Sequence, residues 1–294
     1  MTADRTRPGA LGTKPALAGG QAAPVPFRVQ LVATDLDGTL LAPSGDLTPR
    51  AIAAVGAARR SGLHVVPVTG RPPRLTWDIA EQAGLGPLGV CSNGAVIVDL
   101  ERRSVLEVET IAPEVAAHLV RKSREAFPGI VFALEDLGSF VLEAGFSAGA
   151  AWQPLGEARL AEVGDIISAI GPGTIKLVAR RPGWPAPVLL VALQAQVAGA
   201  GQVTSSGLDW VEIGAPGVSK AYAMQRVCDM LGVPVANVLA VGDNHNDLSV
   251  LAWSGHAAAP ANAIPEVLAI VEHVLPANTD DGVAVMLESL SQGA

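Results

Sequence analysis

The 294-residue chain has little cysteine, little charge and no excess of basic residues. Two cysteines, Cys91 and Cys228, are too few for a disulfide framework, and neither has a partner at the spacing of a zinc site. The formal net charge of -8 argues against nucleic-acid binding, because such proteins need a basic surface. Any anionic ligand must therefore be met by a placed cation.

Long apolar runs are also absent. No stretch reaches the roughly 18 apolar residues of a membrane helix. Residues 1–26 carry Arg5, Arg7 and Lys14 among several Pro and Gly, and they lack the apolar block of a secretory signal. We expect a disordered tail at 1–26 and a cytoplasmic protein with no membrane and no nucleic-acid partner.

What the chain does have is hydrophobic residues, 49% of the total, arranged in alternating strand-like and helix-like segments. The expected strands of this kind lie at 29–34, 64–68, 89–91, 238–241, 256–259 and 273–275. The expected helices lie at 47–60, 75–83, 218–231, 248–253 and 263–271. Such alternation predicts an α/β fold with a Rossmann-like, doubly wound parallel sheet that carries helices on both faces.

The middle of the chain has a different pattern. Its expected strands, at 105–108, 131–134, 140–143 and 174–178, are typical of a sheet with one solvated face. Two helices are expected there, at 113–127 and 187–198. We therefore predict an inserted α+β domain at 95–208, and a core made of residues 27–94 and 209–294.

Two aspartates, Asp35 and Asp37, follow the first expected strand. Residues i and i+2 of a strand share a face, so both carboxylates can point at one substrate. Like charges so close are unfavourable without a cation between them, and Mg²⁺ suits oxygen ligands. One carboxylate would serve as a nucleophile and the other would move a proton. The alternative is an Asp-rich turn that caps a helix.

Further polar clusters follow other expected strands, and carboxyl ends of parallel strands meet at one edge of a sheet. Thr69, Gly70 and Arg71 form a turn that suits phosphate oxygens, although Thr69 is also a plausible helix cap and Arg71 faces either substrate or solvent. Lys220 stands at the start of a helix, where the helix dipole disfavours a cation unless an anion is near. By itself it is an ordinary surface lysine.

The run from Gly242 to Asp247 packs carboxylates and amides into the end of an apolar strand. Asp243 is the expected metal ligand there, with Asp247 or Asn246 supporting it without touching the ion. His245 is expected to be an exposed loop histidine rather than a ligand or base. Asn93, in Ser-Asn-Gly-Ala, would hold polar groups of a substrate or merely turn the chain.

In four motifs taken in order, the chain resembles the haloacid dehalogenase superfamily of phosphatases. The motifs are Asp35-x-Asp37-Gly-Thr, Thr69-Gly-Arg, Lys220, and Gly242-Asp243-x-x-Asn246-Asp247. The place of the insertion, between the second and third motifs, resembles the Cof-type group with its type IIB cap. Ser249, Val250 and the lack of a methionine near Asn262 depart from the usual pattern of these relatives.

The resemblance implies a catalytic role for each motif. Asp35 would be the nucleophile and Asp37 the general acid/base, through an aspartyl-phosphate intermediate. Mg²⁺ would be held by the Asp35 carboxylate, the Asp37 main-chain carbonyl and Asp243. The expected phosphate- and substrate-binding residues are Thr69, Gly70, Arg71, Asn93, Lys220 and Asn246. The inserted cap would close over the site and contact the leaving group.

The expected activity is therefore a Mg²⁺-dependent hydrolysis of small phosphorylated metabolites, such as sugar phosphates. A sugar phosphomutase with the same core is an alternative, and so is a non-catalytic sensor of a phosphorylated ligand. A receiver-type phosphoacceptor is disfavoured, because the long insertion would have no purpose there. Neither the physiological substrate nor the oligomeric state follows from the sequence.

Overall fold

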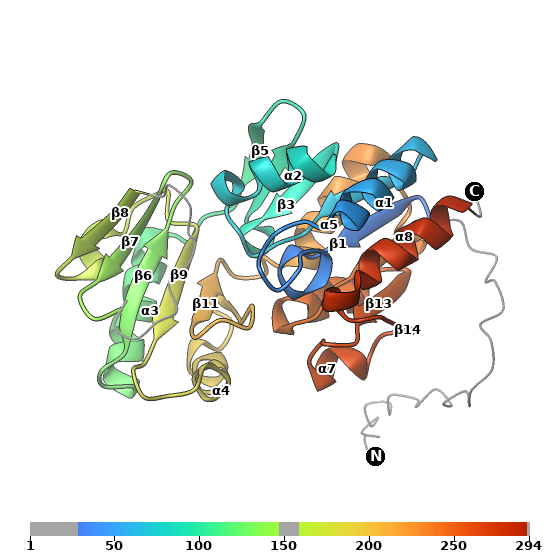
Figure 1. Ribbon diagram of the computed structural model, residues 1–294. Coiled ribbons are helices and arrows are strands. Elements are labelled where there is room, and N and C mark those ends of the chain that lie inside the picture. The colour runs from blue at the N-terminus through green and yellow to red at the C-terminus, as the bar shows by residue number, and fades with distance from the viewer. Residues whose placement is uncertain (1–28, 147–158, 293–294) are drawn as a thin grey trace, which may run out of the picture.

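The computed structural model describes residues 29–146 and 159–292, so the predicted tail at 1–26 lies outside the described residues (Figure 1). A five-stranded parallel sheet, in the order β14-β13-β12-β1-β2, forms the centre of the core. Its strands are β1 (Leu31–Thr34), β2 (His64–Pro67), β12 (Val238–Val241), β13 (His256–Pro260) and β14 (His273–Leu275). The predicted parallel sheet is confirmed, except that the strand expected at 89–91 belongs to a separate antiparallel sheet.

Helices cover both faces of this sheet because successive residues of each strand point to opposite sides. Val32 packs in one apolar cluster with residues of α1 (Pro49–Arg60) and α8 (Gly282–Gln292). Its neighbours Leu31 and Ala33 pack in another cluster, with residues of α5 (Lys220–Leu231) and α6 (Leu248–Trp253). The remaining core helices are α2 (Trp77–Ala83) and the short α7 (Pro265–Leu268).

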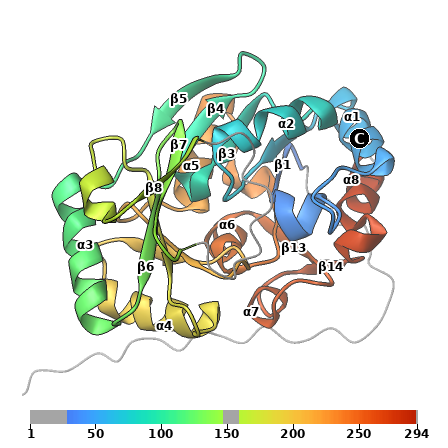
Figure 2. The ribbon, with the colours of Figure 1, turned by 60° about the vertical axis from the view of Figure 1, so that its left-hand side comes forward.

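The insertion contains a mostly antiparallel sheet of six strands, in the order β10-β11-β9-β6-β7-β8. These are β6 (Val131–Glu135), β7 (Ser139–Glu143), β8 (Arg159–Val163), β9 (Lys176–Arg180), β10 (Gln202–Thr204) and β11 (Val211–Gly214). Two helices, α3 (Pro113–Ala126) and α4 (Ala186–Val197), share one apolar cluster with these strands. Figure 2 shows α3 on the side of the insertion far from the core helices α1 and α8.

The strands at the two connections pair differently from the expectation. β4 (Val96–Asp99) and β5 (Ser104–Val108) form a three-stranded antiparallel sheet with β3 (Leu88–Cys91), so the strand expected at 105–108 does not join the sheet of the insertion. β11 pairs with β9 and thus belongs to the insertion's sheet. Two tight turns cause the first difference: the turn after β3 returns β4 along β3, and the turn at residues 100–103 returns β5 along β4. The domain limits themselves stay a prediction.

Within residues 29–146 and 159–292, the structure contains no helix with both the length and the apolar character needed to cross a bilayer.

Gly94 lies where the turn after β3 meets the first residues of α5. Its φ is +102°, and a Cβ there would lie 2.1 Å from the carbonyl oxygen of Ser219. We expect Gly94→Ala to lower the free energy of unfolding by about 2–5 kcal/mol, through backbone strain and a clash with main chain. Urea unfolding followed by circular dichroism measures this.

Gly62→Ala is the matched control, because Gly62 has a φ of +94° but nothing within 4 Å of the added Cβ. Only strain acts there, so we expect a loss of about 1–2 kcal/mol. Equal losses in the two variants would contradict the close approach of Gly94 to Ser219.

Candidate active site

The predicted polar residues converge at the carboxyl ends of three strands of the core sheet. Asp35 follows β1, Thr69 follows β2 by two residues, and Asp243 follows β12 by two residues. Parallel pairing fixes their proximity, since the N–H of Asp35 donates to the carbonyl of Val241 in β12. The chain thus gathers residues about 200 positions apart at one edge of the sheet, as expected for an open α/β fold.

The centre of the site is a buried lysine held between two carboxylates. The Nζ of Lys220 donates to Oδ1 of Asp35 at 2.8 Å and to Oδ1 of Asp247 at 2.6 Å. Lys220 is the first residue of α5, whose N-cap Ser219 accepts the N–H of Tyr222. The sequence suggested that an anion must lie near this lysine. In the structure, the carboxylates of Asp35 and Asp247 are its anionic partners.

Burial controls the charges of this centre. Desolvation raises the pKa of Asp35 well above its usual range; Lys220 opposes the shift, and Asp247 and Asp243 add to it. Burial also disfavours the charged ammonium of Lys220, but Asp247 and Asp35 outweigh burial and raise the pKa of Lys220. The lysine stays cationic, and it offsets only part of the negative charge around it.

Asp243 is the third buried carboxylate. Its Oδ1 accepts a hydrogen bond from Oγ1 of Thr39 at 2.7 Å. Burial raises the pKa of Asp243 to about 6, Asp247 adds to the rise, and the Thr39 hydroxyl works against it. Gly38 makes the approach possible, because its φ is +75° and a Cβ there would lie 2.5 Å from Oδ2 of Asp243.

These residues fit a hard divalent cation. Asp35, Asp243 and Asp247 each offer a carboxylate oxygen within 4.8 Å of the others. Both oxygens of Asp247 already accept hydrogen bonds, from Lys220 and from the N–H groups of Asp243 and Asn244, so Asp247 suits support better than ligation. A cation between Asp35 and Asp243 would relieve the repulsion that raises their pKa values.

The side chain of Asp37 lies outside the buried trio of Asp35, Asp243 and Asp247 and pairs with Arg71. The guanidinium donates from Nε to Oδ2 at 2.7 Å and from Nη2 to Oδ1 at 2.6 Å. Arg71 thus binds a carboxylate of the protein, whereas the sequence left it facing substrate or solvent. This planar two-bond pairing fixes the orientation of Asp37, although the Asp37 side chain remains 48% exposed.

The turn after β2 is held by its own main chain. The N–H of Thr69 donates to the carbonyl of Val90, and the N–H of Arg71 donates to Oγ1 of Thr69 at 3.1 Å. Because that hydroxyl oxygen accepts from Arg71, its hydrogen is left to donate, which suits a phosphate oxygen. A Cβ on Gly70 would lie 3.0 Å from Oδ1 of Asn93, so this turn is packed closely against the next loop.

Asn93 connects the core to the insertion. Its Oδ1 accepts from Nδ2 of Asn246 at 3.1 Å, and its Nδ2 donates to Oε2 of Glu212 at 3.0 Å. Ser92 and Asn93 have φ values of +49° and +58°, a strained conformation for residues other than glycine. Among the described residues, Oδ1 of buried Asn246 has no hydrogen-bond partner and is available to a ligand.

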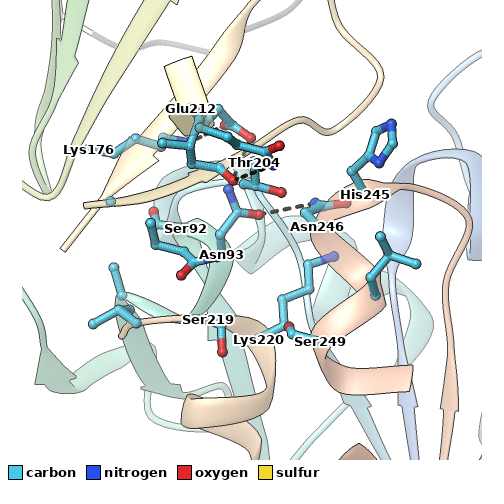
Figure 3. Close-up of a pocket in the computed structure, with 17 residues that line it drawn as sticks. Ser92, Asn93, Lys176, Thr204, Glu212, Ser219, Lys220, His245, Asn246 and Ser249 are labelled. Atoms are coloured by element: carbon cyan, nitrogen blue, oxygen red, sulfur yellow. Dashed lines mark hydrogen bonds and ion pairs between the residues drawn. The ribbon is translucent and has the colours of Figure 1, made fainter. Parts of the chain in front are cut away.

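A cavity of about 290 Å³ lies beside Lys220, between the core and the insertion (Figure 3). Hydroxyl, amide and charged side chains line it together with apolar ones. His245 lines the cavity and is half-buried, not freely exposed as the sequence analysis expected. Its main-chain N–H donates to Oδ1 of Asn244. The labelled lining residues are Ser92, Asn93, Lys176, Thr204, Glu212, Ser219, Lys220, His245, Asn246 and Ser249.

The sequence interpretation gave no role to three charged residues of the insertion that face this region. Glu135, Lys176 and Glu212 lie at the ends of β6 and β9 and within β11, and each is at least 95% buried. The available signal was a charged residue in an otherwise apolar strand, such as Lys176 before Leu-Val-Ala. Charges at strand ends are ordinarily solvated, which is why the signal carried little weight.

Among known protein families, the model for haloacid dehalogenase-like hydrolases matches residues 32–161 and 187–287. The chain belongs to this family. Membership confirms the resemblance drawn from the four motifs.

Two curated relatives match this haloacid dehalogenase-like hydrolase along most of both chains. A pyridoxal phosphate phosphatase of Escherichia coli is 28% identical in an alignment that covers 88% of this chain and 98% of the relative. A 5-amino-6-(5-phospho-D-ribitylamino)uracil phosphatase of Bacillus subtilis is 26% identical, over 88% of this chain and 96% of its own. With the family, these phosphatases make the chain a phosphoric monoester hydrolase.

Solved structures share the fold. A haloacid dehalogenase-like hydrolase from Bacillus subtilis superposes with a TM-score of 0.76 at 24% identity, over 88% of this chain and 99% of that one. The subclass IIB sugar phosphatase BT4131 gives 0.74 at 17% identity, over 89% and 98%. These neighbours confirm the α/β core with an inserted cap.

We expect MgCl2 to raise the melting temperature of the protein at about pH 7.5, and to raise it far less at about pH 5. The raised pKa of Asp243 means that the carboxylate gains its buried charge, and the protein loses stability, as the pH rises through about 6. Ion binding needs that charge, so protons compete with it. At about a hundred times its dissociation constant the ion adds about 2.7 kcal/mol. Thermal melting followed by circular dichroism measures this.

Asp243→Asn should abolish the shift, whereas Asp229→Asn, on the exposed face of α5, should retain it. A shift of equal size in Asp243→Asn would refute the proposed position of the ion.

Proposed function

We propose that this protein is a Mg²⁺-dependent phosphatase that hydrolyses small phosphorylated metabolites through a phosphorylated Asp35. The observation that carries the proposal is the buried contact of Lys220 with Asp35 and Asp247, beside Asp243. A reactive carboxylate, a fixed cation and two further acidic groups are the components that phosphoryl transfer to an aspartate requires.

In the first step, a carboxylate oxygen of Asp35 attacks the phosphorus and the bond from phosphorus to the leaving-group oxygen breaks. Asp37, protonated on one carboxyl oxygen while the other keeps its hydrogen bond from Arg71, gives that proton to the leaving-group oxygen, so the leaving group departs as an alcohol. Lys220, and the hydroxyl of Thr69 whose oxygen accepts from Arg71, would bind the oxygens of the transferring group. The free Oδ1 of Asn246 is placed to accept from a hydroxyl of the substrate.

In the second step, water attacks the phosphorus of the phosphorylated Asp35. Asp37, now ionised, takes a proton from that water, and the bond from phosphorus to the Asp35 oxygen breaks. Inorganic phosphate leaves and both carboxylates return to their starting states. Water as the acceptor makes the reaction a hydrolysis rather than the transfer to a second hydroxyl that defines a mutase.

Asp35 and Asp243, with the main-chain carbonyl of Asp37, would hold the magnesium ion. When bound, the ion neutralises negative charge that develops on the phosphoryl oxygens. The protein's own residues keep the ligands in place: Thr39 fixes Asp243, and Asp247 fixes the main chain at 243 and 244.

The proposed substrates are small polar phosphate esters such as sugar phosphates. The cavity of about 290 Å³ beside Lys220, whose lining includes hydroxyl, amide and charged groups among apolar ones, supports a small leaving group with polar substituents. The relatives act on pyridoxal phosphate and on a phosphoribitylamino pyrimidine according to their names, and one structural neighbour is a sugar phosphatase. All of these are compact phosphate monoesters.

Asp35→Asn should abolish release of phosphate from p-nitrophenyl phosphate, by about 10³-fold or more, because an amide does not form the covalent bond. Phosphate release over time measures this. EDTA should abolish turnover in the wild type and excess Mg²⁺ should restore it. Turnover that survives both treatments would rule out the proposed mechanism.

Arg71→Met should lower kcat for an alkyl phosphate by about tenfold, and should change kcat for p-nitrophenyl phosphate much less. The hydrogen bond from Arg71 to the carboxyl oxygen of Asp37 that does not carry the proton orients the proton donor, and a poor leaving group needs that donor more than p-nitrophenolate does. Parallel kinetics on the two substrates test this. Equal losses on both would mean that Arg71 acts elsewhere than on Asp37.

A further inference from the structure

Three charged residues of the insertion, Glu135, Lys176 and Glu212, form a buried cluster against the core; we call them the interface cluster. Lys176 Nζ donates to Oε1 of Glu212 at 2.7 Å and lies 3.6 Å from Oε2 of Glu135. Register places Glu135 opposite Lys176 in neighbouring strands, so β6 and β9 present the two charges side by side. The proposed chemistry leaves this cluster without a role.

Each member of the interface cluster also contacts the loops that bear the catalytic motifs. Ser92 donates to Oε1 of Glu135 at 2.9 Å, and Asn93 donates to Oε2 of Glu212. The third contact is the most direct, because Lys176 Nζ donates to the carbonyl oxygen of Gly70 at 3.1 Å. Gly70 is the middle residue of the Thr69-Gly70-Arg71 turn.

The cation of Lys176 is kept charged at this place. Burial disfavours the ammonium, but Glu135 and Glu212 outweigh burial and raise the pKa of Lys176 above its ordinary value. Arg74 lies 3.8 Å from Oε2 of Glu135, so the second carboxylate also has a cation of the core beside it. With Arg74 the charges of the cluster are balanced, and the position of the ammonium follows from the two carboxylates that flank it.

The contact at Gly70 determines the direction of the next N–H group. In a trans peptide the carbonyl and the N–H point in opposite directions, so fixing the Gly70 carbonyl toward Lys176 fixes the Arg71 N–H on the other side. That N–H donates to Oγ1 of Thr69. A cation on the carbonyl also polarises the peptide and strengthens this donation. The Thr69 hydroxyl is thereby oriented with its hydrogen free for a phosphate oxygen.

We propose that Lys176 is a positioning residue of the phosphate-binding turn, supplied to the core by the insertion. It orients the Thr69 hydroxyl through the Gly70–Arg71 peptide and does not itself touch the substrate. This inference rests on the proposed function. Because Lys176 and Gly70 belong to different parts of the chain, the turn is complete only while the insertion is in contact with the core.

Binding of inorganic phosphate in the presence of Mg²⁺, measured by isothermal titration calorimetry, tests the proposal. Inorganic phosphate has no leaving group, so a lost contact between the insertion and a leaving group does not affect this measurement. We expect Lys176→Met to weaken phosphate binding by about tenfold to a hundredfold, the range for a hydrogen bond to a charged group. The same variant should lower kcat/KM for p-nitrophenyl phosphate by a similar factor.

Lys176→Met leaves Glu212 buried without a cation, so the double variant Lys176→Met/Glu212→Gln is prepared beside it. The double variant has no carboxylate left without a partner, because Glu135 keeps Arg74 and Ser92. We expect it to fold and to bind phosphate as weakly as the single variant. Lys122→Met is the matched control: Lys122 is an exposed lysine of α3 that pairs with Glu125, and its loss should change nothing.

Phosphate affinity within about twofold of wild type in the folded double variant would overturn the role of Lys176. If the single variant does not fold, the double variant decides alone. Asp35→Asn, measured in parallel, separates this outcome from failure of the proposed function: turnover in Asp35→Asn would remove the covalent mechanism, whatever the phosphate affinity of the Lys176 variants.

Discussion

The ammonium group of Lys220 is the interaction on which the acidic centre depends. Asp35, Asp243 and Asp247 are buried within a few ångströms of one another, and carboxylates so placed repel each other and lose their hydration. Lys220 compensates one negative charge by bonding to two of the three. In the proposed mechanism, the uncompensated charge would attract a further cation, and the fixed ammonium would let an anionic phosphoryl group approach the acidic residues.

The rest of the fold positions that ammonium. The turn after β3 packs against Ser219, the N-cap of α5, at a glycine that admits no Cβ, so the first residue of α5 is held at the sheet edge. Asn93 in the same turn links Asn246 of the core to Glu212 of the insertion. The loops of the candidate active site and the insertion are therefore joined by direct side-chain contacts. In the proposed mechanism the core holds the reacting groups, and residues of the core and of the insertion together line the cavity beside them.

Sequence reasoning predicted the sheet and the proximity of Asp35, Thr69 and Asp243 at its carboxyl edge, because strand direction alone brings these positions together. It also placed Lys220 with them, and in the structure this follows from the packing of Ser219 against the turn after β3. It did not predict the partner of Arg71, because the sequence around a turn does not tell whether a guanidinium contacts substrate, solvent or a carboxylate. The role of Lys176 was not predicted either, because its partners lie on β6, on β11 and in the turn at Gly70, which are distant in sequence. The strand at 105–108 was assigned to the wrong sheet. Its pairing with β4 depends on turns such as the one at Ser92 and Asn93, whose left-handed conformation is not evident from the sequence.

The central claim is that Asp35 carries the phosphoryl group during turnover. Rapid acid quenching of the enzyme during turnover, reduction with borohydride and peptide mass spectrometry test it directly, because borohydride reduces an aspartyl phosphate to homoserine. The account predicts homoserine at position 35 in enzyme quenched with substrate, and unchanged aspartate in enzyme quenched without it. Conversion at another aspartate, or no conversion while phosphate is being released, would contradict the account.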